Sequence, residues 1–584
     1  MKVFILFILL ILPFYGKLQP YQSKAIDYEG IDLHPPMAID LILAGNFGEM
    51  RSNHFHTGLD IKTKGVEGQK IYAIEEGYIS RIRVSPWGYG NAIYIDHPNG
   101  LTSLYAHLRD FPPHVDSLFR AHHKKSESYV LDEIVLEDSF YVKKGEFIAY
   151  SGNSGSSSAP HLHFEIRETE TEHALNPLLF SCYQKRIKDS TKPRVSGIKI
   201  YAVSKNGYMI PGKSKYYSCV LQGDKWVVNG NKPIDVSELV TKNSYLAFGF
   251  HVTDKLDGAG NICGVYHTEL YQEDKKMHEQ KMEYINFDYN RFLNSHQDYY
   301  EFKKKKRNVH KNFVTVVNPL NIYPQKDGII EWENCAGNYS YKAKDVHGNL
   351  RTVEFSLAQP SGSYAKNPLD EVGKYYFPDS INTVLHENFQ LLMESGTFYE
   401  PLQKNFRIDT QSTYLSSKFE FSEYVIPVQQ HFDVRIKVPT KHQKLPPYKF
   451  GIGVISDKGY LSFLGGNYVD GWVETTSRSF GTFVLLSDTI APVIKPLDFN
   501  EGKVVSKYNN LQLQINDNLA GLKSYKAYLN GEWVLMIYNR RKKRYIIPFD
   551  QYSKPYLLKG KNNIKIVAVD RLGNKKQAEY TIVY

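Results

Sequence analysis

At 584 residues the chain is too long for a single hydrophobic core, so several domains are expected. Hydrophobic residues make up 42% of the chain and charged residues 23%, a balance that excludes extensive disorder. The net charge of +10 is spread along the chain, and no nucleic-acid-binding motif accompanies it, so nucleic acid is not an expected partner.

The N-terminus has the pattern of a secretion signal. Lys2 precedes an apolar run over residues 3–15, which is too short to span a bilayer comfortably and suits the hydrophobic region of a signal peptide. We predict a signal peptide over residues 1–16, and the alternative is a retained N-terminal anchor. No later segment is apolar enough to cross a membrane. The expected location is the periplasm or the cell surface.

Residues 45–167 alternate short strand-like runs with glycine turns, as in "GYGNAIYIDHPNG" and "HLHFEIR". Such period-two patterns, punctuated by Gly and Asn, predict an antiparallel sheet. Residues 110–140 interrupt this pattern with helical character and no glycine, so we interpret them as an insertion between two strands. A first domain is predicted over residues 17–187.

The rest of the chain predicts further β domains with an internal repeat. "DSTKPRVSGIKIY" (189–201) resembles "DTIAPVIKPL" (488–497), and "KAKDVHGNL" (342–350) resembles "VAVDRLGNK" (567–575). Ordered pairs of this kind indicate a duplicated module, and strands that end in Asp-x-x-Gly-Asn turns are typical of an immunoglobulin-like sandwich. We predict β modules over 188–360, 361–486 and 487–584. Turn chemistry explains these Asp-rich turns better than calcium binding does.

Four scattered cysteines could form one or two disulfide bridges in an oxidising compartment, but none has a neighbour at metal-ligand spacing. We assign them no role.

The stretch "SNHFHTGLDI" (52–61) and the strand "HLHFEIR" (161–167) together supply a set of metal ligands. If His163 joins His56 and Asp60, two imidazoles and one carboxylate bind a cation and leave one coordination position open. That is the stoichiometry of a catalytic Zn²⁺ site. His54 is interpreted as a polar neighbour of this site rather than a ligand, and Arg51 and Asn53 are candidates for orienting the site or its substrate.

Two further histidines, His107 in "YAHL" and His161, are candidates for the acid–base work beside the metal. A zinc-activated water needs a group that accepts its proton, and the developing oxyanion needs a donor. The sequence does not decide which histidine does which.

The motifs "HFHTGLD", "YAHL", "VKKGEFIAYSGNSG" and "PHLHFEIR", in this order, resemble the lysostaphin-type (LytM-type) zinc metallopeptidases over residues 45–170. The resemblance implies an antiparallel β core with a groove. It also implies zinc binding by His56, Asp60 and His163, assistance by His107 and His161, and hydrolysis of peptide bonds in the stem or cross-bridge of peptidoglycan. The 110–140 insertion departs from the family pattern, and its effect on substrate choice is left open.

The expected protein is therefore a mainly β, exported zinc endopeptidase that acts on peptidoglycan. Its C-terminal modules would place it on the wall or on an envelope protein partner. The alternative is a non-catalytic envelope scaffold or activator of other wall hydrolases, as in family members that have lost their ligands. The complete set of five residues favours the enzyme.

Overall fold

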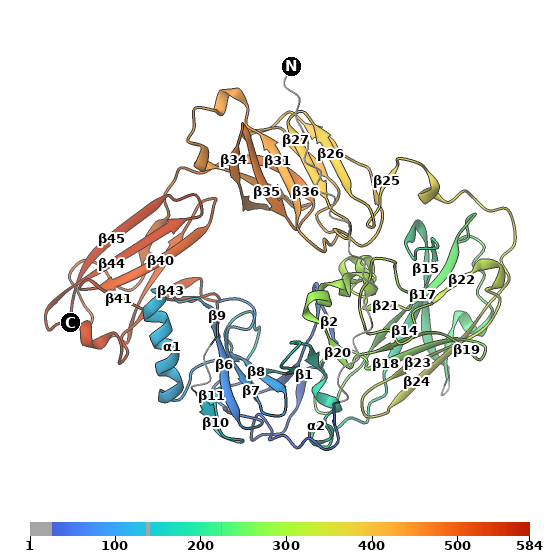
Figure 1. The fold of residues 1–584 in the computed structure, drawn as a ribbon, viewed down its shortest axis with the longest axis horizontal. Helices are drawn as coiled ribbons and strands as arrows, with labels where there is room; N and C mark the ends of the chain where they lie inside the picture. The colour runs from blue at the N-terminus through green and yellow to red at the C-terminus, as the bar shows by residue number, and fades with distance from the viewer. Residues whose placement is uncertain (1–25, 136–139, 223–224) are drawn as a thin grey trace.

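The computed structural model describes residues 26–135, 140–222 and 225–584, and these form a mainly β protein, as predicted (Figure 1). The predicted signal peptide lies outside the described residues. We name four units by their residues: the N-terminal unit (26–187), the second unit (188–360), the third unit (361–487) and the C-terminal unit (488–584). In Figure 1 they follow one another round a circuit, and the last lies beside helix α1 of the first.

The N-terminal unit is built on one antiparallel sheet that carries the candidate site. Alternating apolar residues on its strands pack into the core beneath it, and Ile61, Tyr105 and Phe164 are fully buried there. Two two-stranded sheets accompany it: the hairpin of β2 (Met50–Arg51) and β3 (His54–Phe55), and the pair β5 (Lys70–Tyr72) and β11 (Phe147–Tyr150). The strand order is β1 (Leu43–Gly45), β4 (Leu59–Lys62), β12 (His161–Glu168), β8 (Leu101–Leu108), β7 (Asn91–Asp96), β6 (Gly77–Val84) and β10 (Tyr141–Val142).

The predicted insertion contains one helix, α1 (Pro113–Ser126), and a strand, β9 (Leu131–Val135), which the sequence analysis did not predict. Strand β9 pairs with β6 and so extends the sheet. Pro113 starts the helix, since its fixed φ suits the first turn, and Glu127 ends it in the left-handed region. His123 on this helix is buried, and its ring stacks on that of Tyr129.

The second unit packs two antiparallel sheets around a shared apolar core. One sheet holds β16 (Lys225–Val228), β15 (Met209–Gln222), β14 (Arg194–Val203), β17 (Tyr245–Thr253), β21 (Val309–Lys311) and β22 (Ile329–Glu331). The other holds β19 (Lys275–Lys281), β18 (His267–Gln272), β23 (Gly337–Lys344) and β24 (Leu350–Leu357).

The third unit is a second pair of sheets with its own core. One sheet contains β26 (Asn382–His386), β27 (Phe389–Met393), β31 (Phe432–Lys437), β35 (Trp472–Ser477) and β34 (Asn467–Val469). The other contains β29 (Arg407–Asp409), β30 (Lys418–Phe421), β36 (Gly481–Ser487), β32 (Phe450–Ile455) and β33 (Leu461–Gly465). β25 (Tyr375–Tyr376) and β28 (Leu402–Gln403) form a separate two-stranded sheet in this unit.

The C-terminal unit repeats this two-sheet design around a fourth core. One sheet contains β37 (Val493–Pro496), β39 (Asn510–Asn516), β43 (Arg544–Pro548) and β42 (Ile537–Asn539). The other contains β38 (Lys503–Val504), β45 (Lys575–Val583), β44 (Lys561–Asp570), β40 (Leu522–Leu529) and β41 (Glu532–Val534).

The two copies of the sequence repeat have the same hydrogen bonds. In the second unit the Asn349 side-chain amide donates to the Asp189 carbonyl at 3.1 Å and to the Asp345 carboxylate at 2.7 Å. In the C-terminal unit the Asn574 side-chain amide donates to the Asp488 carbonyl at 3.1 Å and to the Asp570 carboxylate at 2.6 Å. In each copy the asparagine ties the turn after a late strand to the start of the module.

The second unit also extends the N-terminal unit. A strand from its middle, β20 (Tyr284–Ile285), pairs with β13 (Ala174–Leu175), which in turn pairs with β12. A separate apolar cluster at this junction packs Phe55 against residues 282–323, and the Phe55 backbone exchanges hydrogen bonds with the Asn290 side chain at 2.6 and 3.2 Å. The segment just before His56 is therefore held by the neighbouring unit.

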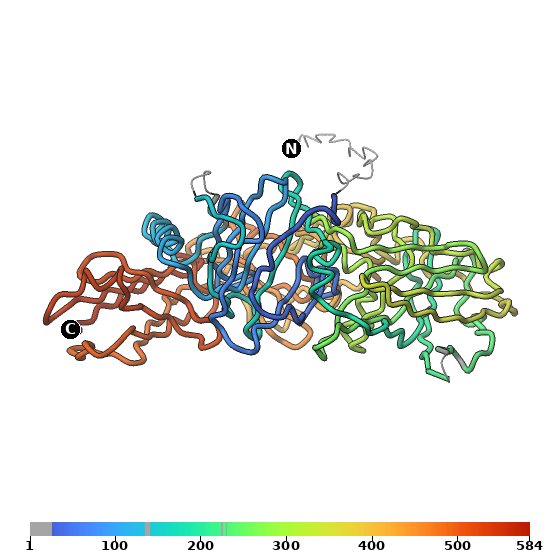
Figure 2. The backbone as a smooth tube through the Cα atoms, turned by 90° about the horizontal axis from the view of Figure 1, so that it is seen from below, coloured from blue at the N-terminus to red at the C-terminus, as the bar shows by residue number. Residues whose placement is uncertain are grey.

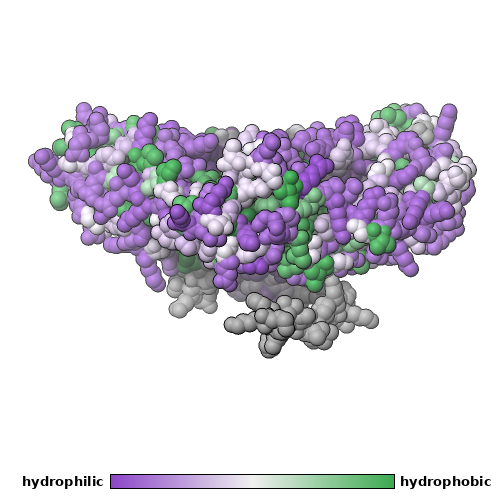
Figure 3. Space-filling model, turned by 90° about the horizontal axis from the view of Figure 1, so that it is seen from above, coloured by the Kyte–Doolittle hydropathy of each residue, from purple (hydrophilic) through white to green (hydrophobic). Residues whose placement is uncertain are grey.

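Seen from below, the four units form a flattened body (Figure 2). Most of the face shown in Figure 3 is hydrophilic, and its apolar residues lie in small separate groups. Among the described residues, no helix has both the length and the apolar character needed to span a membrane. All four cysteines are free.

Candidate metal centre

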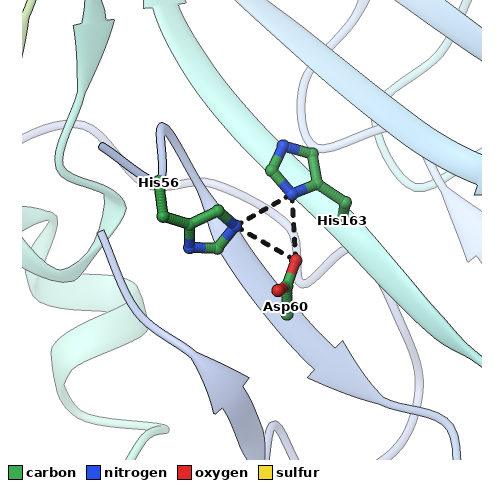
Figure 4. Close-up of side chains that lie close together, drawn as sticks. All are labelled: His56, Asp60 and His163. Atoms are coloured by element: carbon green, nitrogen blue, oxygen red, sulfur yellow. Dashed lines mark hydrogen bonds and ion pairs between the residues drawn. The ribbon is translucent and has the colours of Figure 1, made fainter. Parts of the chain in front are cut away.

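The sheet register brings the three predicted ligands together (Figure 4). Asp60 on β4 lies directly opposite His163 on β12, and paired residues of neighbouring strands project from the same face. His56 comes from the short connection between β3 and β4. The three predicted ligands therefore come from one turn and two adjacent strands.

The three side chains meet through single atoms. His56 Nε2 lies 3.0 Å from His163 Nδ1 and 3.1 Å from Asp60 Oδ1, and His163 Nδ1 lies 2.9 Å from the same Oδ1. All three residues are buried. One N or O atom from each residue thus borders a common point, which is the arrangement a single small cation needs.

The outer hydrogen bonds of the two histidines determine which ring atoms face this point. His56 Nδ1 donates to the Asn46 carbonyl at 2.7 Å, and His163 Nε2 donates to Glu165 Oε1 at 2.8 Å. In each neutral ring the other nitrogen then carries a lone pair. With both rings neutral, two nitrogen lone pairs and a carboxylate oxygen therefore converge on this point. Such a donor set repels itself unless a cation occupies the centre, and its N/O composition fits zinc.

The ionisation of these groups follows from their burial and their neighbours. Burial lowers the pKa of His56 to about 4, so its ring is neutral at pH 7. Burial opposes ionisation of Asp60, but contacts with His56, His161 and His163 outweigh it and hold the pKa of the carboxyl well below its usual range. Burial lowers the pKa of His163, yet hydrogen bonds to Asp60 and Glu165 raise it to about 9. Without a cation a proton takes its place, and metal binding must release that proton.

Glu165 is a functional residue that the sequence analysis did not single out. It is fully buried and accepts hydrogen bonds from His163, from Thr57 at 2.6 Å and from Tyr89 at 2.7 Å, while Arg167 pairs with its other oxygen at 2.8 Å. A carboxylate behind a ligating histidine fixes the ring and raises its basicity. Its position two residues after His163, on the same face of β12, was the available signal.

Arg51 contacts the site through the free side of Asp60. Its guanidinium lies 2.5 Å from Asp60 Oδ2, while Oδ1 faces the two histidines. This pairing holds the carboxylate in one orientation. His54, in contrast, is exposed and bonded to the Ser52 carbonyl, in agreement with its interpretation as a polar neighbour.

His107 and His161 lie side by side next to the ligands. Their ring centroids are 4.7 Å apart, and His161 Nε2 is 3.3 Å from Asp60 Oδ1. His107 Nδ1 donates to the Ser154 carbonyl at 2.9 Å, and His161 Nδ1 donates to the Ala159 carbonyl at 2.8 Å. In their neutral forms both rings therefore keep an unprotonated Nε2 available for acid–base work.

His107 also has an unusual backbone conformation. Its φ of 59° places a non-glycine residue in the left-handed region at the end of β8. Strain of this kind persists where the surrounding structure holds it, and here the His107 amide donates to the Tyr89 carbonyl at 2.8 Å. The conformation turns the side chain at the end of the strand towards His161.

Two family models match the chain. Residues 54–117 and 120–177 match Peptidase family M23, and residues 374–488 match the Zu5-like domain. The first match contains all five predicted site residues. The second covers most of the third unit and ends at the first residue of the C-terminal unit; the sequence analysis predicted a β module over 361–486.

Individual relatives match about a fifth of the chain. The chain is 33% identical over 112 residues to DD-carboxypeptidase/endopeptidase Mpg of Neisseria meningitidis, which covers 19% of this chain and 20% of that protein. It is 30% identical over 116 residues to Lipoprotein NlpD of Yersinia enterocolitica, covering 20% of this chain and 93% of that protein. Among solved structures, the catalytic domain of lysostaphin from Staphylococcus simulans shares 25% identity, with a TM-score of 0.18, over 23% of this chain and 87% of that one.

The chain spans about a fifth of the length of the curated relatives it first matches, so the similarity describes one unit and not the whole protein. Within that unit the family match, the order of the motifs and the strand register agree. Through its N-terminal unit, the chain belongs to peptidase family M23.

Proposed function

We propose that the protein is an exported, zinc-dependent endopeptidase that hydrolyses peptide cross-links or stem peptides of peptidoglycan. The observation that carries this proposal is the convergence of two histidine ring nitrogens and one carboxylate oxygen on a single point. The relatives named DD-carboxypeptidase/endopeptidase and DD-endopeptidase support the substrate class.

Each residue of the site has a separate task. His56, Asp60 and His163 would hold the zinc ion, and Glu165 would keep the His163 ring in its ligating orientation. Zinc, when bound, would act as a Lewis acid that polarises the scissile carbonyl and activates water.

His107 and His161 supply the proton transfer. One would accept the proton of the attacking water at its Nε2, and the other, once protonated, would donate a hydrogen bond to the developing oxyanion. The hydrogen bonds at their Nδ1 atoms keep both rings aimed at the ligands while this occurs.

The alternative is a non-catalytic envelope scaffold or activator of other wall hydrolases. Loss of a ligand or of an auxiliary histidine would favour it, whereas the proximity of His56, Asp60 and His163, with His107 and His161 paired beside them, supports the enzyme. The proposal has three further parts. The chain divides into four domains (17–187, 188–360, 361–486 and 487–584), and a signal peptide is cleaved at residue 16. The β modules bind the wall or an envelope partner.

Digestion of purified sacculi with the zinc-loaded protein tests the function. We expect muropeptide fragments, identified by mass, whose release stops with a chelator and with His163→Ala. The control is His54→Ala, which removes an exposed histidine close to the site. Absence of new fragments from zinc-replete protein would argue for the scaffold.

A further inference from the structure

The C-terminal unit reaches the loop beside the candidate site through one arginine. Arg541 lies in the turn between β42 and β43, and its terminal Nη2 donates to the carbonyls of Asn153 and Ser157, each at 3.0 Å. The second of these contacts joins residues 384 positions apart. A planar guanidinium with several donors is suited to bridging two carbonyls in this way.

The loop that Arg541 bridges also holds both auxiliary histidines. Residues 151–160 connect β11 to β12, and the Ser154 carbonyl in this loop accepts the hydrogen bond from His107 Nδ1. The Ser157 hydroxyl lies 3.1 Å from His161 Nδ1. One side chain of the C-terminal unit thus spans residues 153–157 of the loop, which include a hydrogen-bond partner of His107 and one of His161.

The contact is local. A cavity of about 300 Å³ separates the rest of the hairpin from the loop, bordered by Ser154 on one side and Tyr538 on the other. Beside it, the Arg540 guanidinium lies 4.6 Å from the centre of the Trp87 ring. The hairpin therefore contacts the loop through Arg541, while Arg540 contacts Trp87 in a neighbouring segment.

The insertion helix provides a second attachment that fixes the hairpin in place. Arg120 of α1 pairs with Asp550 at 3.0 Å, and Glu127 at the end of the helix pairs with Lys526 at 2.6 Å. The Arg120 guanidinium also lies 4.7 Å from the centre of the Tyr552 ring. The feature that departs from the family pattern is thus the docking surface for the C-terminal unit.

We propose that Arg541 is a positioning residue of the peptidase site, through which the C-terminal unit holds loop 151–160 in the conformation that aims His107 and His161. This inference rests on the proposed function. The loop has other anchors within the N-terminal unit, such as the Ser154 hydroxyl, which accepts from the Asn91 amide at 2.9 Å. Removal of Arg541 therefore loosens the loop without unfolding it.

The test compares full-length Arg541→Ala and Arg541→Lys with Lys542→Ala, a control in the same exposed turn. With soluble cross-linked muropeptides we expect Arg541→Ala to lower kcat about ten- to a hundred-fold, as displaced catalytic groups do, while KM changes little. Arg541→Lys should recover part of kcat, because an ammonium still donates to carbonyls but lacks the planar fork. Zinc content should equal that of the wild type in all three variants.

Hydrogen exchange of residues 151–160 gives a readout that does not depend on activity. We expect faster exchange in Arg541→Ala and wild-type exchange in Lys542→Ala. Unchanged exchange and unchanged kcat in Arg541→Ala would overturn the inference, and so would an equal loss in Lys542→Ala. An inactive wild type would refute the proposed function alone, since the exchange comparison still tests the role of Arg541.

Discussion

Replacing Glu165 with glutamine tests whether the buried carboxylate behind His163 supports both the fold and the metal. Glu165 has no exposed surface, and its partner Arg167 is 7% exposed. Removal of one charge from a buried ion pair costs about 3–5 kcal/mol, because the remaining charge stays desolvated. The glutamine amide also offers one acceptor oxygen where the carboxylate offers two, so a donor among His163, Thr57, Tyr89 and Arg167 loses its partner.

Two measurements separate the effect of Glu165→Gln on zinc affinity from its effect on stability. Changes behind a ligating histidine lower metal affinity or activity about 10- to 100-fold, so we expect Glu165→Gln to weaken zinc binding in chelator competition by that factor. Hydrogen exchange of the β12 amides reports the local opening free energy, which avoids the assumption that a multidomain chain unfolds in one step.

A matched control and a double variant sharpen the comparison. Glu172 also pairs with Arg167, at 3.0 Å, but it is 39% exposed, so Glu172→Gln should cost about 0–1 kcal/mol and leave zinc affinity unchanged. The double variant Glu165→Gln/Arg167→Gln should recover stability without recovering zinc affinity. Unchanged zinc affinity in Glu165→Gln would refute the role of Glu165 in holding the ligand.

Two further predictions follow from the structure. His163→Ala should purify without stoichiometric zinc, whereas the exposed His54→Ala should bind zinc as the wild type does; equal zinc content in both by atomic emission would contradict the ligand assignment. Burial and the carboxylates of Asp189 and Asp345 raise the pKa of Asp254 to about 8. The folded state then binds more protons than the unfolded state between about pH 4 and 8, so the free energy of unfolding should fall by up to about 1.4 kcal/mol per pH unit across that window. Asp254→Asn should flatten this fall in denaturant titrations, and the same slope in both proteins would refute it.

The core of the candidate site could be predicted from the sequence because its geometry is local. His161 and His163 alternate with apolar residues on one strand, which places both on one face, and the register with β4 then puts Asp60 opposite His163. Glu165 obeys the same alternation, so the pattern that located the ligands also contained their support. The mainly β fold is confirmed, while the immunoglobulin-like topology of the modules stays a prediction.

The remaining features depend on contacts between distant segments. Nothing near residue 541 indicates that its guanidinium reaches Ser157, and a charged turn usually remains solvated. Similarly, His123 lies in a polar part of its helix, yet its ring stacks on Tyr129. Tyr129 lies just before strand β9, which the helical pattern did not predict. Tertiary packing of this kind leaves no periodic trace in the sequence.

The circuit of units has a consequence for the order in which the protein is made. The five residues of the site are complete once position 163 has left the ribosome, but the arginine that reaches Ser157 follows 384 residues after that serine. At about 5–20 residues per second, synthesis of that stretch takes roughly 20–80 s. A growing chain therefore has the five residues of the candidate site long before it has the arginine that contacts loop 151–160, and a chain truncated before residue 541 never acquires that contact.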